Sequence, residues 1–116
     1  MPKVYVVSNS GHDYSAAKQH GEVVFLFAGK VNVFAIGKLV QTVEEKLAEA
    51  KVEDYLVLSG NSVAGCLAFY SQLERLGRVQ LLIFSFRDQR YEARTVTREL
   101  FTVAPERVGG TNGDDS

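Results

Sequence analysis

The spacing of apolar residues changes repeatedly along the chain, and this limits the folds that it can adopt. Short runs of β-branched and aromatic residues, at 3–7, 22–27, 55–58 and 79–86, alternate with segments whose apolar residues recur every three or four positions. The first pattern is typical of strands and the second of amphipathic helices. Because strands separated by crossover helices form parallel sheets with right-handed connections, the chain is expected to form an α/β domain.

The first two helical segments follow the first two strands. A helix of two turns is expected over residues 13–21, with Asp13 as its N-cap. A longer helix is expected from about residue 33 to residue 50, with Asn32 as its cap. The residues expected on the buried face of the longer helix are Val33, Ile36, Val40, Val43 and Leu47.

A third helix is expected after residues 59–62, capped by Asn61 or Ser62 and ended by Gly77. Its single cysteine, Cys66, is expected to be a small buried residue in a reducing compartment. The spacing gives this helix an apolar face made of Val63, Cys66, Leu67, Tyr70, Leu73 and Leu76.

Length and composition indicate one globular domain. The chain has 116 residues, of which 46% are apolar. We assign residues 1–104 to a single Rossmann-like domain and residues 105–116, which are poor in apolar side chains, to a disordered acidic tail. The formal net charge of −1 argues against general nucleic-acid binding. No apolar run is long enough to cross a membrane, and we expect a cytoplasmic protein.

The compact way to wind these elements is a three-layer Rossmann-like domain. Its mainly parallel five-stranded sheet would have the strand order 2-1-3-4-5, with residues 91–97 as an antiparallel edge strand. The order reverses between the first and third strands, where such sheets bind ligands at the carboxyl ends of the strands. The loops that follow these two strands supply the predicted ligand-binding residues Ser8, Asn9, Ser10, Gly11, His12, Ser59, Gly60, Asn61 and Ser62.

The chemistry of these loops suits a small anion. The segment 59–62 brings hydroxyls and free backbone N–H groups to a helix N-terminus, where the helix dipole favours a phosphate or carboxylate. The alternative is that these residues only form the turn and cap the helix. A dinucleotide is not supported, because no Gly-x-Gly-x-x-Gly motif is present, and we predict no cofactor.

A hydrolase is a further alternative. His12 beside Asp13 could perform acid–base chemistry on a serine of the third-strand loop, but the nucleophile-elbow motif is absent. We therefore favour a protein without enzymatic activity and assign His12 and Asp13 catalytic roles only under that alternative. One cysteine and two histidines do not supply a four-ligand zinc site, so no metal is predicted.

The last hairpin offers a candidate interface. Arginines cluster around Tyr91, but acidic residues lie between them, so a solvated edge strand protected by its charges is one interpretation. The other is a protein interface formed by Arg90, Tyr91 and Arg94, including sheet extension across a homodimer.

Four segments, at residues 4–15, 21–26, 54–60 and 77–84, resemble a group of small proteins, encoded by tailed bacteriophages, that has no established activity. The resemblance covers roughly residues 3 to 96, and its most specific part is Ser10-Gly-His-Asp-Tyr-Ser15. It implies an accessory protein made in the cytoplasm of the bacterial host. Our first hypothesis for its function is binding of a small anionic, nucleotide-like ligand, and the second is an interaction that modulates a host protein.

Overall fold

The computed structural model describes residues 1–102, which form one five-stranded sheet in the order β2-β1-β3-β4-β5. Neighbouring strands are parallel except for β4 and β5, which form an antiparallel hairpin. The predicted α/β class, the strand order and the antiparallel edge strand are confirmed. The strands are β1 (Lys3–Ser8), β2 (Glu22–Phe27), β3 (Tyr55–Val57), β4 (Arg78–Ser85) and β5 (Arg90–Thr97).

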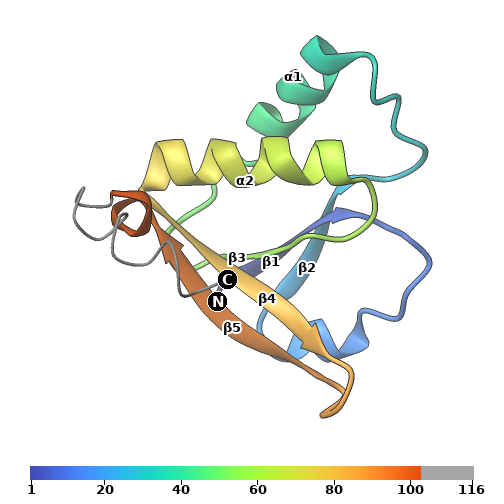
Figure 1. Ribbon diagram of the computed structural model, residues 1–116. Coiled ribbons are helices and arrows are strands. Elements are labelled where there is room, and N and C mark those ends of the chain that lie inside the picture. Colours follow the sequence, from blue (N-terminus) through green and yellow to red (C-terminus); the bar gives the residue numbers. More distant parts are fainter. Residues whose placement is uncertain (103–116) are drawn as a thin grey trace, which may run out of the picture.

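The two faces of the sheet are covered unequally. Both α-helices, α1 (Ile36–Lys46) and α2 (Ser62–Leu76), lie on the same face (Figure 1). The opposite face carries the 3₁₀ helix η1 (Ser15–Gln19), which is the third layer of the predicted architecture. A second 3₁₀ helix, η2 (Arg98–Phe101), follows β5.

The core is divided by the sheet into two clusters. On the helical face, Leu47 of the α1 C-terminus and Ala64 and Ala68 of α2 pack with strand residues such as Tyr5 and Leu56. On the η1 face, the buried residues are Val4, Val6, Tyr14, Ala17, Val57, Leu82 and Tyr91.

Helix α2 begins and ends where the sequence indicates, but its buried face only partly agrees with the predicted one: Leu67 and Leu73 pack against the core as expected. The Asn61 side chain accepts a hydrogen bond from the N–H of Ala64 at 3.0 Å, and Gly77 ends the helix with φ of 78°. The prediction that Cys66 and Tyr70 face the core is wrong, because both are exposed. The buried face instead consists of Ala64, Gly65, Ala68, Ser71 and Gln72.

Helix α1 starts later than expected. Asn32 is not its cap, because the Asn32 side chain accepts from the N–H of Phe34 at 3.0 Å in the preceding turn, and the helix begins at Ile36. Leu39 and Val43 are its buried residues, whereas Ile36 and Val40 are 46% and 39% exposed. The prediction is confirmed for Val43 and Leu47, which are buried, but not for Ile36 and Val40.

The short helix also differs in its cap. Tyr14, not Asp13, occupies the N-cap position of η1, and the Asp13 carboxylate accepts from the N–H of Ser15 at 2.9 Å. The predicted tail, residues 105–116, lies outside the described residues. Within residues 1–102, no helix is long and apolar enough to cross a membrane.

Candidate functional site

The two loops at the reversal of strand order lie against each other, as their positions after β1 and β3 predict. Ser8 donates to the carbonyl oxygen of Ser59 twice, from its N–H at 3.2 Å and from its hydroxyl at 3.0 Å. The Ser8 hydroxyl in turn accepts from the N–H of Asn61 at 3.3 Å. These bonds fix the end of β1 to the start of α2.

A cluster of hydroxyl groups joins the same loops from the side of η1. The hydroxyl of Ser10 lies 3.0 Å from that of Ser59 and 2.9 Å from that of Tyr14. The Tyr14 and Ser59 hydroxyls also hydrogen-bond to each other. Burial raises the pKa of Tyr14, but the hydrogen bonds from the Ser10 and Ser59 side chains and from the Ser10 N–H outweigh it, so the net pKa lies below the usual value.

Tyr14 is the member of this cluster that sequence reasoning missed. It directly follows the predicted site residues His12 and Asp13. The sequence feature that could have indicated its contact with Ser10 is the separation of four residues between them. Its ring packs edge-on against Phe25 of β2, with the ring centroids 5.5 Å apart. This packing holds the polar end of the ring at the loops.

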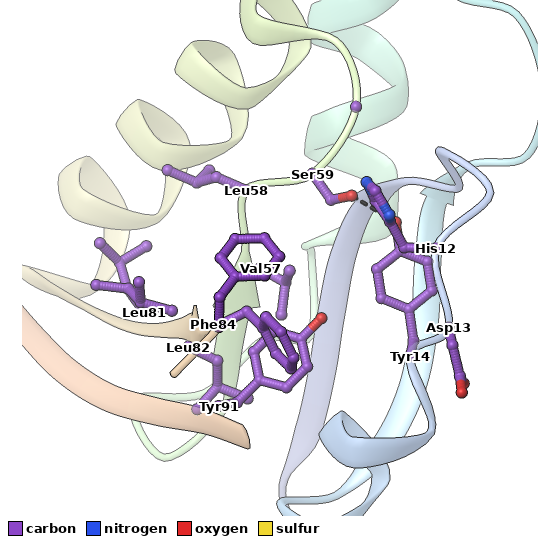
Figure 2. Close-up of a pocket in the computed structure, with 13 residues that line it drawn as sticks. His12, Asp13, Tyr14, Val57, Leu58, Ser59, Leu81, Leu82, Phe84 and Tyr91 are labelled. Carbon is purple, nitrogen blue, oxygen red and sulfur yellow. Dashed lines mark hydrogen bonds between the residues drawn. The ribbon is translucent and has the colours of Figure 1, made fainter. Parts of the chain in front are cut away.

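A cleft opens beside these loops because β4 separates from β3. The two strands pair only at Tyr55↔Gln80 and Leu56↔Leu81, whereas the pairing of β4 with β5 continues to Ser85↔Arg90. The end of the hairpin therefore extends past the end of β3. The resulting cleft has a volume of about 660 Å³ and lies between the loop that carries Tyr14, the end of β3 and the β4–β5 hairpin (Figure 2).

Most of the cleft wall is apolar. Val57, Leu82, Phe84 and Tyr91 belong to the core cluster on the η1 face and line the interior. Leu58, Ile83 and Phe86 also line the cleft and are half-exposed or more, with Phe86 80% exposed. The remaining described lining residues are His12, Asp13, Tyr14, Ser59, Gly60 and Leu81.

Three aromatic rings of the hairpin form a continuous group in this wall. The ring of Phe84 meets the rings of Phe86 and Tyr91 edge-on, each at a centroid distance of 5.1 Å. Burial raises the pKa of the Tyr91 hydroxyl, and the nearby Tyr14 and Asp13 add to this effect. The Tyr91 hydroxyl is therefore neutral at physiological pH and can donate a hydrogen bond.

The predicted ligand-binding residues divide into two groups. His12, Ser59 and Gly60 line the cleft. The others do not line it: Ser8, Ser10 and Asn61 bond within the loops, the Asn9 side chain accepts from the N–H of Gly11 at 2.9 Å, and Ser62 is the first residue of α2.

Gly60 is required by the backbone of the loop. Its φ is +86°, and a Cβ at this position would lie 1.7 Å from the Ser8 hydroxyl oxygen. A side chain at position 60 would therefore disturb the contact between the loops before it could affect a ligand.

The charges around the cleft are acidic rather than basic. Among the described lining residues there is no Lys or Arg. A hydrogen bond from the backbone of Ser15 lowers the pKa of the exposed Asp13 carboxyl, which is therefore ionised at neutral pH. That carboxylate bonds to Ser15 rather than to His12, so the geometry does not form the Asp–His pair of a hydrolase triad. Residues 1–102 hold no group of three or more His, Cys, Asp or Glu side chains arranged to bind a metal ion.

The structure does not bring the three predicted interface residues together. Tyr91 is buried in the cleft wall, whereas Arg90 and Arg94 are exposed and form ion pairs with Glu92 at 3.5 and 3.2 Å. Arg98, the next arginine along the chain, donates to the carbonyl oxygens of Leu73 and Glu74 at the end of α2.

Comparison with known protein families identifies the family of this chain. Residues 2–98, which include all five strands and every described cleft residue, match the family of Phage Pam3 gp32-like proteins. The chain belongs to this family. The predicted resemblance to a phage protein family is thereby confirmed. No curated protein matches the chain, and no solved structure matches it.

Proposed function

We propose that this phage protein is a binding protein without enzymatic activity, whose ligand is a small nucleotide-like molecule held in the cleft. The main support for the proposal is the position of a cleft of about 660 Å³ at the reversal of strand order. Its volume is within the range of small-molecule sites, and α/β sheets bind ligands at this point.

The aromatic group supports a flat ring system as the buried part of the ligand. Phe84 and Tyr91 line the interior, and Phe86 stands 80% exposed beside Phe84. An exposed ring at the mouth of an apolar cleft can stack on a base or a similar heterocycle. The Tyr91 hydroxyl is a hydrogen-bond donor for the ring edge.

The anionic part of the ligand would point toward the start of α2. Ser59 and Gly60 line the cleft directly before this helix of 15 residues, whose N-terminal end favours a negative charge. Asp13 lies on the same cleft and repels an anion, so the ring rather than the phosphate supplies most of the affinity. We place this activity in the cytoplasm of the infected bacterium, where nucleotides are abundant.

Saturation-transfer NMR tests the proposal with the four ribonucleosides and their monophosphates as probes. We expect the wild-type protein to saturate the base protons of at least one probe. Phe86→Ala should lower the affinity for that probe about tenfold. The matched control is Phe34→Ala, because Phe34 is 90% exposed and does not line the cleft. Equal signals for all three proteins, or none for the wild type, would overturn the proposal.

A second candidate function is binding of a host protein at the mouth of the same cleft. Leu58, Ile83 and Phe86 expose apolar surface around it, which suits an apolar side chain of a partner. Pull-down from a bacterial lysate with the wild-type, Phe86→Ala and Phe34→Ala proteins tests this candidate. A host protein retained by the wild type and by Phe34→Ala, but lost with Phe86→Ala, would support it.

A further inference from the structure

The backbone of β5 has hydrogen-bonding groups that β4 does not use. The N–H of Arg98 donates to the carbonyl oxygen of Gly77 at 3.1 Å and so continues the β4–β5 ladder by one pair. Because hydrogen-bonded pairs alternate in an antiparallel ladder, the even-numbered residues of β5 bond to β4. The odd-numbered residues Tyr91, Ala93 and Thr95 therefore direct their N–H and C=O groups away from the sheet.

A side-chain contact supports this assignment. The guanidinium of Arg94 donates to the carbonyl oxygen of Ala93 at 2.7 Å, so this oxygen faces outward and not toward β4. Within residues 1–102, no other strand pairs with this edge, because β5 is the last strand of the sheet. An edge strand of eight residues whose outward backbone groups pair with no other strand is a template for pairing with a further strand.

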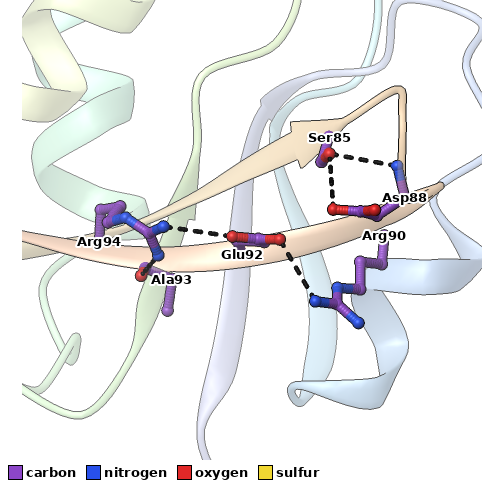
Figure 3. A network of polar contacts seen from close by, with 6 residues as sticks. All are labelled: Ser85, Asp88, Arg90, Glu92, Ala93 and Arg94. Atoms are coloured by element: carbon purple, nitrogen blue, oxygen red, sulfur yellow. Dashed lines mark hydrogen bonds and ion pairs between the residues drawn. The ribbon is translucent and has the colours of Figure 1, made fainter.

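The charged side chains of β5 form a pattern that is complementary to itself. Arg90, Glu92 and Arg94 lie on one face of the strand, with Glu92 between the two arginines (Figure 3). Both arginines are about two-thirds exposed, at 66% and 65%, so these ion pairs contribute little to stability within one chain. The same side chains remain available to a second strand.

We propose that two copies of this chain pair through their β5 strands, antiparallel, with the twofold axis at Ala93. The N–H and C=O of Ala93 would bond to Ala93 of the second copy, and Tyr91 would pair with Thr95 on both sides. Arg94 would release the Ala93 carbonyl oxygen and face Glu92 of the second copy, at the close spacing of a non-hydrogen-bonded pair. The two sheets would become one.

The charges select this register over its neighbours. An axis at Glu92 would place Glu92 against Glu92 and Arg90 against Arg94 of the second copy. An axis at Arg94 would place Arg94 against Arg94. Like charges in directly opposite positions are destabilising. An axis at Tyr91 or Thr95 would pair fewer residues, because β5 spans only Arg90–Thr97. Ala93 is thus the axis that combines unlike charges with the longest ladder.

The ends of the hairpin fit the same arrangement. Antiparallel pairing would bring the β4–β5 turn beside η2 of the second copy. Two residues of η2, Leu100 and Phe101, are 63% and 66% exposed. The dimer would therefore cover apolar surface that the single chain leaves in water.

Sedimentation velocity on the full chain tests this proposal. We expect the wild type to be a dimer at micromolar concentration, and Glu92→Arg, which places Arg against Arg, to raise the dissociation constant at least about tenfold. Combining Glu92→Arg with Arg94→Glu restores the cross-strand pairs with their signs exchanged. The double variant should recover the wild-type dissociation constant within about threefold.

A backbone variant keeps the test independent of charge. Ala93→Pro removes the outward N–H at the axis while leaving the bonds to β4, and proline is accepted on edge strands. We expect a monomer whose far-ultraviolet circular dichroism equals that of the wild type. A monomeric wild type would overturn the proposal. A dimer that survives both Glu92→Arg and Ala93→Pro would also overturn it, since the contact would then lie elsewhere.

Discussion

Tyr14 and Ser59 hydrogen-bond through their hydroxyl groups across the point where the strand order reverses, although 45 residues separate them in the chain. Ser10 bonds to both, so the segment before η1 is attached to the end of β3. This attachment forms one wall of the cleft, while the β4–β5 hairpin forms the other. The shape of the cleft therefore depends on the hydroxyl cluster.

Replacing Tyr14 by Phe removes the shared hydroxyl and keeps the ring that packs on Phe25. We expect Tyr14→Phe to lower the free energy of unfolding by about 1 kcal/mol, the net value of a hydrogen bond in a protein. Urea unfolding measures this change. Tyr70→Phe is the control, because Tyr70 is 64% exposed, and it should change stability by less than about 0.5 kcal/mol. Equal effects of the two variants would show that the cluster does not stabilise the fold.

The lowered pKa of Tyr14 gives this difference a pH dependence. A group whose pKa is lower in the folded than in the unfolded chain contributes stability that is present above the unfolded pKa and lost as the pH falls through the folded pKa. The stability difference between wild type and Tyr14→Phe should therefore grow as the pH rises toward about 10, the pKa of an unfolded tyrosine. Burial raises the pKa of Tyr5 and Tyr91, which has the opposite effect, and this burial is common to both proteins. The smaller contribution of Tyr14 to the raised pKa of Tyr91 is lost in Tyr14→Phe.

Urea unfolding at a series of alkaline pH values measures this growth. A parallel ultraviolet titration should show that the first tyrosinate formed is absent in Tyr14→Phe. A stability difference that stays constant with pH would contradict the assigned pKa direction.

Gly60 and Gly37 make a matched pair of glycine positions. At Gly60 an added Cβ meets the Ser8 hydroxyl oxygen at 1.7 Å and φ is +86°, whereas at Gly37 in α1 nothing lies within 4 Å. We expect Gly60→Ala to destabilise the fold by at least about 2 kcal/mol and Gly37→Ala to be neutral or to stabilise by up to about 1 kcal/mol. Thermal and urea unfolding of the two variants measure these changes.

The contact between Gly60 and Ser8 can be isolated in a double variant. Adding Ser8→Ala to Gly60→Ala removes the clashing oxygen, so the two changes should be non-additive, with the double variant more stable than their sum predicts. Additive effects would mean that the left-handed backbone alone, and not the close approach of the loops, requires glycine.

Asp13 should affect phosphates more than uncharged ligands. Its lowered pKa keeps the carboxylate charged at neutral pH beside the cleft. Asp13→Asn should therefore raise the affinity for a nucleoside monophosphate a few-fold at low salt and leave the affinity for the nucleoside unchanged. Calorimetric titrations with both ligands measure the two affinities. An equal change for both would show that Asp13 does not lie near the bound phosphate.

The strands and their order followed from the sequence because apolar β-branched runs and crossover helices leave few topologies. The caps Asn61 and Gly77 were also predicted correctly, since each meets a specific backbone need. The loops after β1 and β3 were expected to meet, and they do. These features depend on local chemistry and on general rules of chain connection.

The helix faces did not follow in the same way. Helix α2 packs on the sheet through small residues, Ala64, Gly65 and Ala68, which carry little signal in an apolar pattern. Cys66 and Tyr70 lie on the exposed side, whereas Leu67 and Leu73 pack against the core, so the predicted face was right in part and rotated away from the buried one. Close approach of backbones, which favours small side chains, is a tertiary property.

The cleft itself could not be predicted. It exists because β3 is short and β4 continues past it, and the length of pairing between two strands depends on three-dimensional contacts. The roles of Tyr14 and Tyr91 depend on the same geometry, since each points from a different element into one space.

The most direct test of ligand binding is an amide NMR titration of the wild-type protein with nucleoside monophosphates. We expect saturable shifts for His12, Ser59, Gly60 and Phe86, with the amides of the distant helix α1 unchanged. Absence of saturable shifts with every monophosphate, or shifts confined to residues away from the cleft, would contradict this expectation.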